Sequence, residues 1–474
     1  MPKKKKYIHF VGIKGVGMTP LAIISKEAGF KVTGSDIEEE FITDAALIKA
    51  GIMPYVGFSP ENINDPDLVI TTGAHNGFDN IEVKKAKELG IEVISAGEAL
   101  GKFMDGKIFG RSFYGISIAG THGKTTTTGM IATILKECRL DPTYVIGTGN
   151  VGLLGAPGHY GRGKHFVAEA DEYATEPRYD KTPRFLWQKP KIAVITNIEY
   201  DHPDVYASLD EVSEAFRKFA NQLPDNGLLI ACGDDREIRR IISVYQKPVI
   251  TYGFLSDNTY RLTKVNISGE HMFFRASAYG QDLGEFMVSV IGEHNALNGL
   301  AAFIAAIEAG VPLEKARTAI RSFKGSKRRL EFIGQLTTGA KVYDDYAHHP
   351  TEIKKTLLAL RSQYPKNKIV CIFEPHTYSR TKKLFNDFLK SFEYADTVVV
   401  MDIYASLREP IDQTISSKLL TDAMHKEHKD VTYLPKFADI VEYINQKKFR
   451  SDTILVTMGA GNIYKINSQL KFST

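Results

Sequence analysis

The chain has 474 residues, 43% of them hydrophobic, and a formal net charge of +4. This length suggests about three domains, and the hydrophobic content is ample for several cores. The 60 basic residues are interspersed with 56 acidic ones, whereas a nucleic-acid-binding surface needs clustered basic residues. We therefore expect no nucleic-acid partner.

Cysteine usage and hydropathy bear on the compartment. Cys138, Cys232 and Cys371 lie far apart without metal-ligand spacing, which favours reduced thiols. The basic N-terminus is not followed by the apolar core of a secretory signal. The sequence has no run of about 18 apolar residues that could span a membrane. These features predict a cytoplasmic protein that does not bind membranes.

The first segment alternates strand-like and helical patterns. A strand at 7–11 runs into the glycine-rich turn "GIKGVGM", and further strand-like runs follow at 31–36, 67–73 and 91–95. Strands alternating with helices predict a parallel sheet covered on both faces. We expect a small Rossmann-like domain over residues 1–112.

The second segment begins with a strand at 114–119 that leads into "GTHGKTTTT". The runs "HFVAEAD", "KIAVITNI" and "GLLIACG" predict more parallel strands, whereas residues 260–292 alternate apolar and polar side chains between turns. Such alternation is typical of an antiparallel meander. A helix over 295–309 returns the chain to the core. The prediction is a central P-loop ATPase domain over residues 113–323.

The third segment contains the strand-like runs "AKVYDDY", "KIVCIFEP", "DTVVVMDIY" and "TILVTMG", separated by helical patterns such as "HPTEIKKTLLALRSQY". It predicts a second Rossmann-like domain over residues 324–474. The whole chain is thus expected to be an α/β protein of three domains. Ligands in such folds bind at the carboxyl ends of the strands, where the glycine turns lie.

The stretch "SIAGTHGKTTTTGM" at 117–130 ends like a phosphate-binding loop, but Ile118 stands where the usual G-x-x-x-x-G-K-S/T pattern has its first glycine. A strand before it and a helix after it supply the required context. The backbone N–H groups of 121–125 would then point at phosphate oxygens. Lys124 would neutralise the transferred phosphoryl group, and the Thr125 hydroxyl would bind Mg²⁺. The alternative is a glycine turn with a chance Lys-Thr.

The turn "GIKGVG" has the spacing G-x-x-G-x-G and not the dinucleotide fingerprint G-x-G-x-x-G. Asp36 ends the second strand, where a Rossmann fold places its ribose ligand. A dinucleotide site, a site for another diphosphate and a purely structural turn all remain open from this pattern.

Carboxylate-rich stretches follow two strands beside the phosphate loop. "EADEY" begins at Glu169, and "NIEYDHPDVY" contains His202. Because both come at strand carboxyl ends, Glu169 and His202 could reach a shared metal site, unless each stretch is a surface loop. Oxygen ligands favour Mg²⁺, and one histidine among carboxylates is poor support for zinc.

Later motifs add polar residues at helix starts and strand ends. "GEHNALNG" places Asn295 and Asn298 on one face of a helix. "KRRLE", "DDYAHHPTE" and "EPHTYSR" supply the remaining candidates, which are Arg329, Asp345, His348, His349, His376 and Arg380.

In this order, "GIKGVGM", "GTHGKTTTT", "EADEY", "NIEYDHPD", "GEHNALNG", "RRLEF", "DDYAHHPTE" and "PHTYSRT" resemble the Mur ligase family along nearly the whole chain. That family has the short "GTxGKT" loop, so the missing glycine at 118 is a family feature. The resemblance implies a UDP-binding N-terminal domain, a central ATPase domain and a C-terminal domain that closes over the site. It also implies ATP and Mg²⁺ as cofactors and an acyl-phosphate intermediate.

The resemblance assigns roles residue by residue. For the UDP-sugar it implies Gly15, Val16, Gly17, Met18, Ser35 and Asp36. For ATP it implies Gly120, Thr121, His122, Gly123, Lys124, Thr125, Thr126, Asn295, Asn298, Arg329 and Asp345. For the metal it implies Thr125, Glu169 and His202, and for the amino acid His348, His376 and Arg380. The catalytic set is then Lys124, Glu169, His202, His348 and Arg380.

The acceptor is where the motifs disagree. "PHTYSRT" and "DIYASLREP" follow the members that add L-alanine to UDP-N-acetylmuramate, although Thr377 replaces an arginine of their usual pattern. Phe216 lies where other members carry a modified lysine, which the alanine-adding members also lack. "EADEYATEPRYDKTPRFLWQKP" looks more like the recycling members that attach an L-alanyl-γ-D-glutamyl-diaminopimelate tripeptide. Because the third domain holds the incoming amine, we expect L-alanine.

Two functions of other classes remain as rivals. One is an NAD-dependent oxidoreductase, suggested by the first glycine turn, and the other is a nucleotide-gated binding protein without chemistry. ADP release that requires both UDP-N-acetylmuramate and an amino acid would separate a ligase from both. We expect a monomer or a homodimer.

Overall fold

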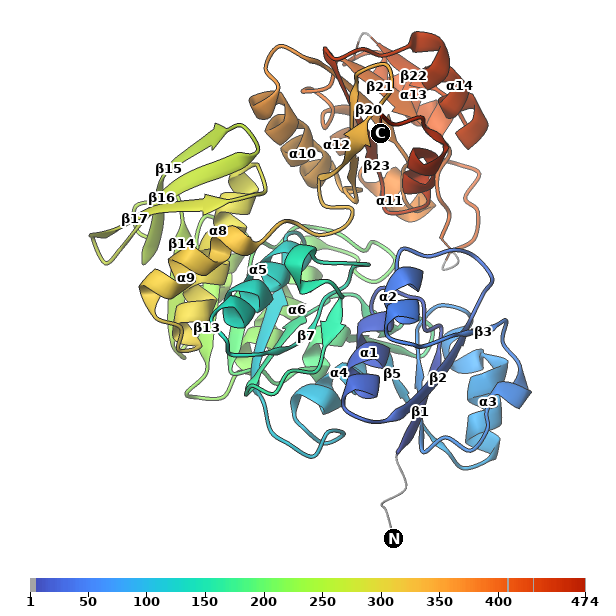
Figure 1. The fold of residues 1–474 in the computed structure, drawn as a ribbon, viewed down its shortest axis with the longest axis vertical. Coiled ribbons are helices and arrows are strands. Elements are labelled where there is room, and N and C mark those ends of the chain that lie inside the picture. The colour runs from blue at the N-terminus through green and yellow to red at the C-terminus, as the bar shows by residue number, and fades with distance from the viewer. Residues whose placement is uncertain (1–5, 407–408, 429, 474) are drawn as a thin grey trace.

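The computed structural model describes residues 6–406, 409–428 and 430–473, and it has the α/β fold that the sequence predicts. Three large sheets with helices beside them follow one another along the chain (Figure 1). One of these sheets lies in each of the segments 1–112, 113–323 and 324–474. This arrangement supports our proposal of three domains with these boundaries.

The first sheet is wholly parallel and doubly wound, as predicted. Its strands are β1 (Tyr7–Val11), β2 (Lys31–Asp36), β3 (Tyr55–Val56), β4 (Leu68–Thr71) and β5 (Glu92–Ser95), and its helices are α1 (Thr19–Glu27), α2 (Asp44–Lys49), α3 (Ile81–Glu88) and α4 (Ala96–Met104). The strand order is β3-β2-β1-β4-β5. Every residue of β1 is buried, which explains why its sequence is mainly apolar and is interrupted only by His9.

The second sheet has ten strands, namely β6 (Tyr114–Ala119), β7 (Thr143–Val145), β8 (Gly158–His159), β9 (His165–Glu169), β12 (Ile192–Ile195), β13 (Leu228–Cys232), β14 (Val249–Gly253), β15 (Tyr260–Ser268), β16 (His271–Ala278) and β17 (Gln281–Val288). Their order is β17-β16-β15-β14-β13-β12-β6-β9-β7-β8. The strands β14, β13, β12, β6, β9 and β7 pair in parallel, and β15–β17 form the predicted antiparallel meander. Sequence patterns did not predict the short strands β7 and β8.

Five helices surround this sheet: α5 (Lys124–Glu137), α6 (Leu209–Asn221), α7 (Arg236–Ile242), α8 (Glu293–Glu308) and α9 (Leu313–Ala319). Both α5 and α8 are buried over most of their length and lie side by side against the sheet (Figure 1). Their buried residues belong to the main hydrophobic core, which also includes the meander. This packing fixes the start of α5, and with it the phosphate loop.

The third sheet contains β18 (Glu331–Gln335), β19 (Lys341–Asp345), β20 (Lys368–Phe373), β21 (Thr397–Val400), β22 (Val431–Tyr433) and β23 (Thr453–Met458). Its helices are α10 (Pro350–Gln363), α11 (Tyr378–Lys383), α12 (Phe385–Leu389), α13 (Ser417–Met424) and α14 (Phe437–Lys447). The order is β18-β19-β23-β20-β21-β22, and only β18 pairs in the antiparallel sense among these strands. The four strands predicted here, at β19, β20, β21 and β23, are confirmed.

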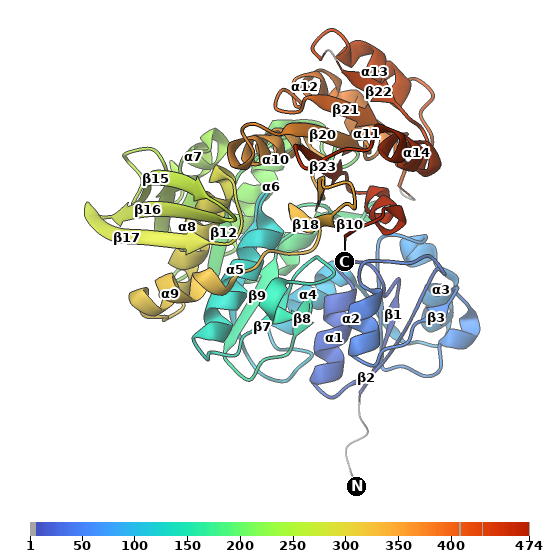
Figure 2. The same ribbon diagram turned by 45° about the horizontal axis from the view of Figure 1, so that its top comes forward.

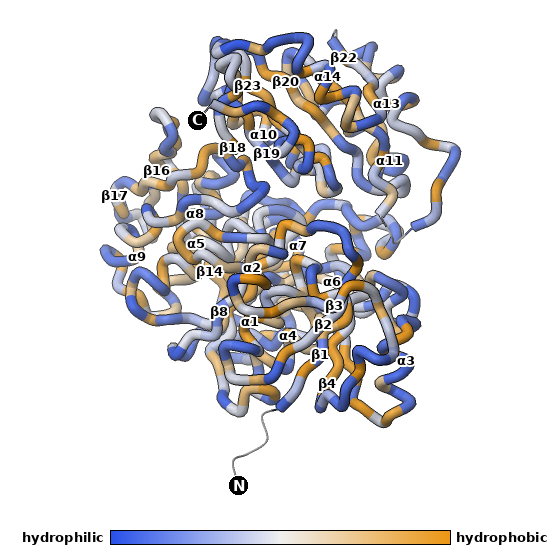
Figure 3. The backbone as a smooth tube through the Cα atoms, turned by 45° about the vertical axis from the view of Figure 1, so that its right-hand side comes forward, coloured by the Kyte–Doolittle hydropathy of each residue, from blue (hydrophilic) through white to orange (hydrophobic). Residues whose placement is uncertain are grey.

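The third segment lies over the other two, which sit side by side (Figures 1 and 2). Glu39 of the first segment accepts hydrogen bonds from Asn462 (3.0 Å) and Lys465 (2.7 Å) of the third. Hydrophobic stretches concentrate within the sheets and hydrophilic ones in the outer loops (Figure 3). Among the described residues, no helix is long and apolar enough to cross a membrane.

Candidate active site

The phosphate loop joins β6 to α5 and depends on two glycines with positive φ. Gly120 has φ +138° and Gly123 has φ +83°. A Cβ at Gly120 would lie 2.0 Å from Thr196 Oγ1, and one at Gly123 would lie 2.6 Å from Asn298 Oδ1. Ile118, by contrast, is a buried residue of β6 that pairs with Glu169 of β9. The loop therefore begins only at Gly120, which explains why position 118 needs no glycine.

Lys124 is the first residue of α5 and is held by a carboxylate. Its Nζ lies 2.8 Å from Glu172 Oε2 and donates to the Thr121 carbonyl at 3.2 Å. Burial opposes the charge on Lys124, but the carboxylates of Glu172 and Asp171 outweigh burial and raise its pKa. The ammonium is thus charged at the mouth of the loop, where phosphates bind in such folds.

Thr125 and Glu169 come together beside the lysine. The Thr125 hydroxyl donates to Glu169 Oε2 at 3.1 Å, and the Gly147 N–H donates to Glu169 Oε1 at 2.6 Å. Burial raises the pKa of the Glu169 carboxyl. A hydroxyl and a carboxylate in contact at the end of β9 are oxygen donors of the kind that Mg²⁺ prefers.

His202 and Glu169 line one cavity, which we call the first cavity, but the carboxylates nearest to His202 belong to other residues. Its Nε2 is 3.8 Å from both Glu172 and Asp201, and its ligand atom lies within 4.8 Å of those of Asp171 and Glu172. The structure thus groups His202 with Asp171 and Glu172, and Glu169 with Thr125. Sequence reasoning did not single out Asp171 and Glu172, although both stand in the quoted "EADEY" motif.

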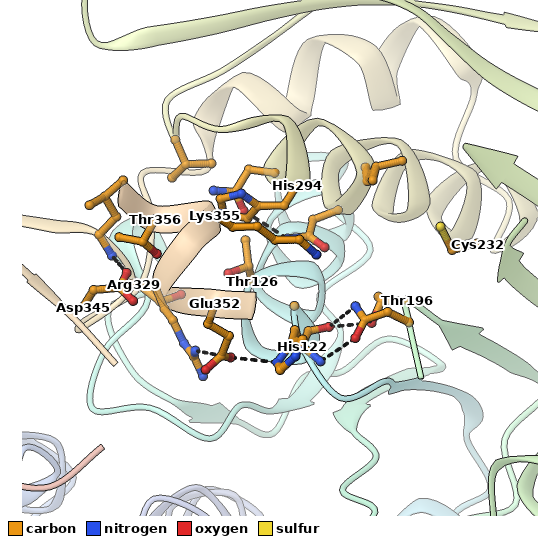
Figure 4. Close-up of a pocket in the computed structure, with 18 of the residues that line it drawn as sticks. His122, Thr126, Thr196, Cys232, His294, Arg329, Asp345, Glu352, Lys355 and Thr356 are labelled. Atoms are coloured by element: carbon orange, nitrogen blue, oxygen red, sulfur yellow. Dashed lines mark hydrogen bonds and ion pairs between the residues drawn. The ribbon is translucent and has the colours of Figure 1, made fainter. Parts of the chain in front are cut away.

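A second cavity, of about 230 Å³, lies on the other side of the phosphate loop between the second and third segments (Figure 4). Asn295 and Asn298 of α8 line it and hydrogen-bond each other at 3.0 Å, so the predicted shared face is confirmed. Tyr252, Leu297 and Phe323 add apolar walls, a combination that suits a flat heteroaromatic ring.

Arg329 and Asp345 line this cavity from the third segment (Figure 4). Arg329 donates to Thr125 Oγ1 at 3.2 Å, so it reaches the phosphate loop. Asp345 accepts the N–H groups of Leu330 (2.6 Å) and Ala347 (2.8 Å), and burial raises its pKa to about 7. Arg329 therefore points at the phosphate loop, while Asp345 fixes the backbone at Leu330 and at Ala347.

Arg380, His376 and His348 line the first cavity from the third segment, and Lys124 lines it from the phosphate loop. Arg380 is buried, donating from Nε to Asp201 Oδ1 at 2.8 Å and from Nη1 to His376 Nδ1 at 3.0 Å. The Asp201 partner, in "NIEYDHPD", was missed because the contact crosses between two segments. Burial lowers the pKa of His348 to about 3, so its ring is neutral.

Of the residues expected to hold a UDP-sugar, Val16 and Gly17 line the first cavity, next to α4. Ser35 and Asp36 are buried and do not line it: the Ser35 hydroxyl donates to Glu82, and Asp36 accepts the Lys14 N–H at 2.7 Å. Gly15 and Met18 shape the turn, since the Gly15 carbonyl accepts the Met18 N–H at 2.8 Å.

The two motifs that disagreed about the acceptor lie in different places. Much of "EADEYATEPRYDKTPRFLWQKP" forms a hairpin of β10 (Ala174–Glu176) and β11 (Asp180–Pro183), which sequence patterns did not predict. Trp187 beyond it packs against Gly101 of α4. In "DIYASLREP", Tyr404 stacks on His376 with ring centroids 5.6 Å apart, whereas Leu407 and Arg408 lie outside the described residues.

Comparison with known proteins matches all three segments to one family. Residues 7–108 match the domain described as "Mur ligase family, catalytic domain", residues 118–306 the Mur ligase middle domain, and residues 328–461 "Mur ligase, glutamate ligase domain". The chain belongs to the Mur ligase family. The predicted family resemblance is thereby confirmed.

Individual relatives match this chain over nearly its whole length. The UDP-N-acetylmuramate–L-alanine ligase of Desulfitobacterium hafniense (strain Y51) is 40% identical over 465 residues, covering 98% of this chain and 99% of its own. The crystal structure of the UDP-N-acetylmuramate–alanine ligase of Thermotoga maritima matches with a TM-score of 0.80 and 29% identity, covering 98% and 97% of the two chains. A murein peptide ligase from Psychrobacter arcticus matches with a TM-score of 0.73 and 25% identity over 98% of each chain.

Proposed function

We propose that this Mur ligase joins L-alanine to the lactyl carboxylate of UDP-N-acetylmuramate and converts ATP to ADP and phosphate. The relatives that bear this name match nearly every residue of the chain at about 40% identity. The observation that carries the proposal is one cavity lined both by Lys124 of the phosphate loop and by Arg380 of the third domain. We further propose a cytoplasmic enzyme, since ATP is its phosphoryl donor. A monomeric or homodimeric state stays a prediction.

The first step activates the sugar carboxylate. A carboxylate oxygen attacks the γ-phosphorus of ATP, the bond to the β-phosphate oxygen breaks, and an acyl phosphate and ADP result. The Lys124 ammonium and the N–H groups of residues 123–125 would stabilise the charge spread over the transferred group. The N–H groups of Thr121 and His122, which the sequence also assigned to phosphate, donate to the Asn197 carbonyl (3.0 Å) and side-chain oxygen (2.8 Å) instead. Asn295 and Asn298 would hold the adenine end of the nucleotide, and Arg329 would reach the phosphates from the third domain.

The donor set fits Mg²⁺. Thr125 and Glu169 offer oxygen ligands in contact, and His202 with Asp171 and Glu172 offers a second group. A magnesium ion bound there would supply positive charge to the phosphate oxygens. The chain's own part is to keep these ligands close together and beside Lys124, whose ammonium is held by Glu172.

The second step forms the amide. The amine attacks the acyl carbon, a tetrahedral intermediate forms, and phosphate leaves. We assign His348 Nδ1–H as the donor to the Tyr346 carbonyl at 3.0 Å, which leaves the Nε2 lone pair to accept a hydrogen bond from the attacking amine. Because the pKa of His348 is about 3, the ring orients the amine, and the departing phosphate takes the proton that the amine loses. Arg380 would bind the alanine carboxylate, with His376 holding the guanidinium in place. Gly15, Val16, Gly17 and Met18 would bind the UDP part beside α4.

Phosphate release tests the proposed function directly. With ATP and Mg²⁺ present, we expect release only when UDP-N-acetylmuramate and L-alanine are both added. The tripeptide L-alanyl-γ-D-glutamyl-diaminopimelate should give little release in place of L-alanine. Efficient turnover of the tripeptide without turnover of L-alanine would transfer the assignment to a recycling ligase, and release that needs no acceptor would indicate a plain ATPase.

Metal dependence should follow the two candidate ligand groups. We expect Glu169→Gln and His202→Gln each to raise the Mg²⁺ concentration for half-maximal activity by about tenfold or more, because each removes a metal ligand. A Mg²⁺ titration of the phosphate-release rate measures the effect. Glu308→Gln, at an exposed carboxylate of α8, is the matched control. Unchanged titrations in both site variants would remove these residues from the metal site.

A further inference from the structure

A second cluster of metal-ligating side chains lies between the central and third domains, apart from the carboxylates assigned to Mg²⁺. It consists of His122 from the phosphate loop, Glu199 from the loop after β12, and His349 immediately before α10. Their ligand atoms all lie within 4.8 Å of one another. Neither the ligase mechanism nor the comparisons give these three residues a common role.

The spacing within the cluster suits a small tetrahedral ion. His122 Nε2 is 3.4 Å from Glu199 Oε2, and His349 Nδ1 is 3.7 Å from the same oxygen. Zinc binds nitrogen and oxygen ligands at about 2.0–2.1 Å, so two tetrahedral ligands of one ion lie roughly 3.4 Å apart. The observed separations therefore need only small movements to accept an ion.

The other nitrogen of each ring already has an acceptor. His122 Nδ1 is 3.1 Å from Glu352 Oε1, an ion pair drawn in Figure 4, and His349 Nε2 is 3.2 Å from the Tyr200 carbonyl. Histidine ligands of metals characteristically donate their second N–H to a carboxylate or carbonyl in this way. The rings are thus oriented with His122 Nε2 and His349 Nδ1 toward Glu199. His349 Nδ1 also accepts the Thr351 N–H at 3.3 Å, and the ion would displace this long bond because both use the same lone pair.

Two imidazoles and one carboxylate form a different donor set from the oxygen-rich Mg²⁺ groups. We propose that His122, Glu199 and His349 bind a zinc-like divalent transition ion that ties the phosphate loop to the third domain. Glu199 and Glu352 supply negative charge around the ion, and His122 and His349 are buried while Glu199 is partly exposed. His122, Glu199 and Glu352 also line the cavity of Figure 4, which gives the ion a route in.

The ion would connect two domains, because His122 and Glu199 belong to the central domain and His349 to the third. Thr351 of the third domain already bonds Glu199, so the ion would reinforce an existing contact. If the chain is the proposed ligase, the bound Zn²⁺ should slow its turnover, because the ion would hold the two domains together. The binding itself does not depend on that function and is tested separately.

The test uses the metal-stripped full-length protein in excess Mg²⁺, which fills the oxygen-donor groups. Zn²⁺ is titrated in competition with a chromophoric chelator, and Co²⁺ absorption reports the ligand geometry. We expect one tight Zn²⁺ per chain and a loss of affinity of about tenfold or more in His349→Asn and in Glu199→Gln. Asparagine at 349 keeps an acceptor for the Thr351 N–H, so the start of α10 is preserved.

His159→Gln is the matched control. His159 also has two carboxylate neighbours, but Glu27 binds its Nδ1 and Asp141 its Nε2, on opposite sides of the ring. We expect its Zn²⁺ affinity to equal that of the unmodified chain. Equal affinity in His349→Asn and Glu199→Gln would overturn the proposal. Loss of binding in His202→Gln alone would also overturn it, because the ion would then lie with Asp171 and Glu172.

Catalysis gives an independent readout. Inhibition of phosphate release by Zn²⁺ should weaken in parallel with binding in His349→Asn. Tight Zn²⁺ binding in a chain that shows no ligase activity would sink the proposed function and leave the metal site standing. An active ligase that binds no Zn²⁺ would overturn the metal site and leave the proposed function standing.

Discussion

Lys124→Ala should lower the rate of phosphate release by about 10²–10³-fold or more, because it removes an oriented charge at a phosphoryl transition state. The lysine lies within the phosphate loop, and its pKa is raised by the carboxylates beside it despite burial. Steady-state kcat with saturating ATP, UDP-N-acetylmuramate and L-alanine measures the loss. Retention of more than about a tenth of the unmodified rate would disprove the role of Lys124 in phosphoryl transfer.

The control for this substitution is Lys136→Ala, which removes an exposed lysine from the last turn of the same helix. It should leave kcat unchanged. The fold of Lys124→Ala should also persist, because burial raises the pKa of Glu172 and favours the neutral carboxyl once its partner is gone. If Lys124→Ala loses its cooperative thermal transition, it has unfolded. The prediction is then judged on Lys124→Arg, which keeps a positive charge and should still lower kcat.

The sequence predicted those elements whose patterns are local. The buried strands β1, β6 and β23 are mainly apolar runs that end at glycine turns, and the alternation along β16 matches its alternating burial. The sequence did not predict the hairpin β10–β11, because its strands have three and four residues and are too short for a periodic signal.

The sequence predicted the site residues that belong to a single motif or to adjacent strand ends. It did not predict the contacts between residues of different domains. Lys124, Thr125 and Glu169 follow from strand ends that must adjoin in a parallel sheet. The contact of Arg380 with Asp201 and that of His122 with Glu352 cross between domains. No periodicity encodes how two domains sit against each other. Asp36 shows the converse limit: its place at a strand end suggested a ligand contact, yet the turn's own Lys14 N–H occupies its carboxylate.

Arg380→Lys should raise the KM for L-alanine by about 10- to 100-fold, since a hydrogen bond to a charged group contributes roughly 1.5–3 kcal/mol. Lysine keeps the charge but loses the planar fork that can contact Asp201, His376 and a carboxylate together. The KM for ATP should change little, because Arg380 lines the cavity with His348 and not the one with Asn295 and Asn298. Initial rates at varied L-alanine and varied ATP separate the two effects.

Arg380 also pairs with Asp201 between domains, so a general loss of domain contact has to be told apart from lost alanine binding. Asp201→Asn removes the ion pair and leaves the guanidinium in place. We expect it to raise the KM for L-alanine less than Arg380→Lys does, because the fork can still bind the substrate carboxylate. Lys382→Ala, at an exposed residue of the same helix, should change neither KM. Equal rises in the KM for ATP and L-alanine in Arg380→Lys would show that the arginine serves closure alone, and the alanine carboxylate would need another partner.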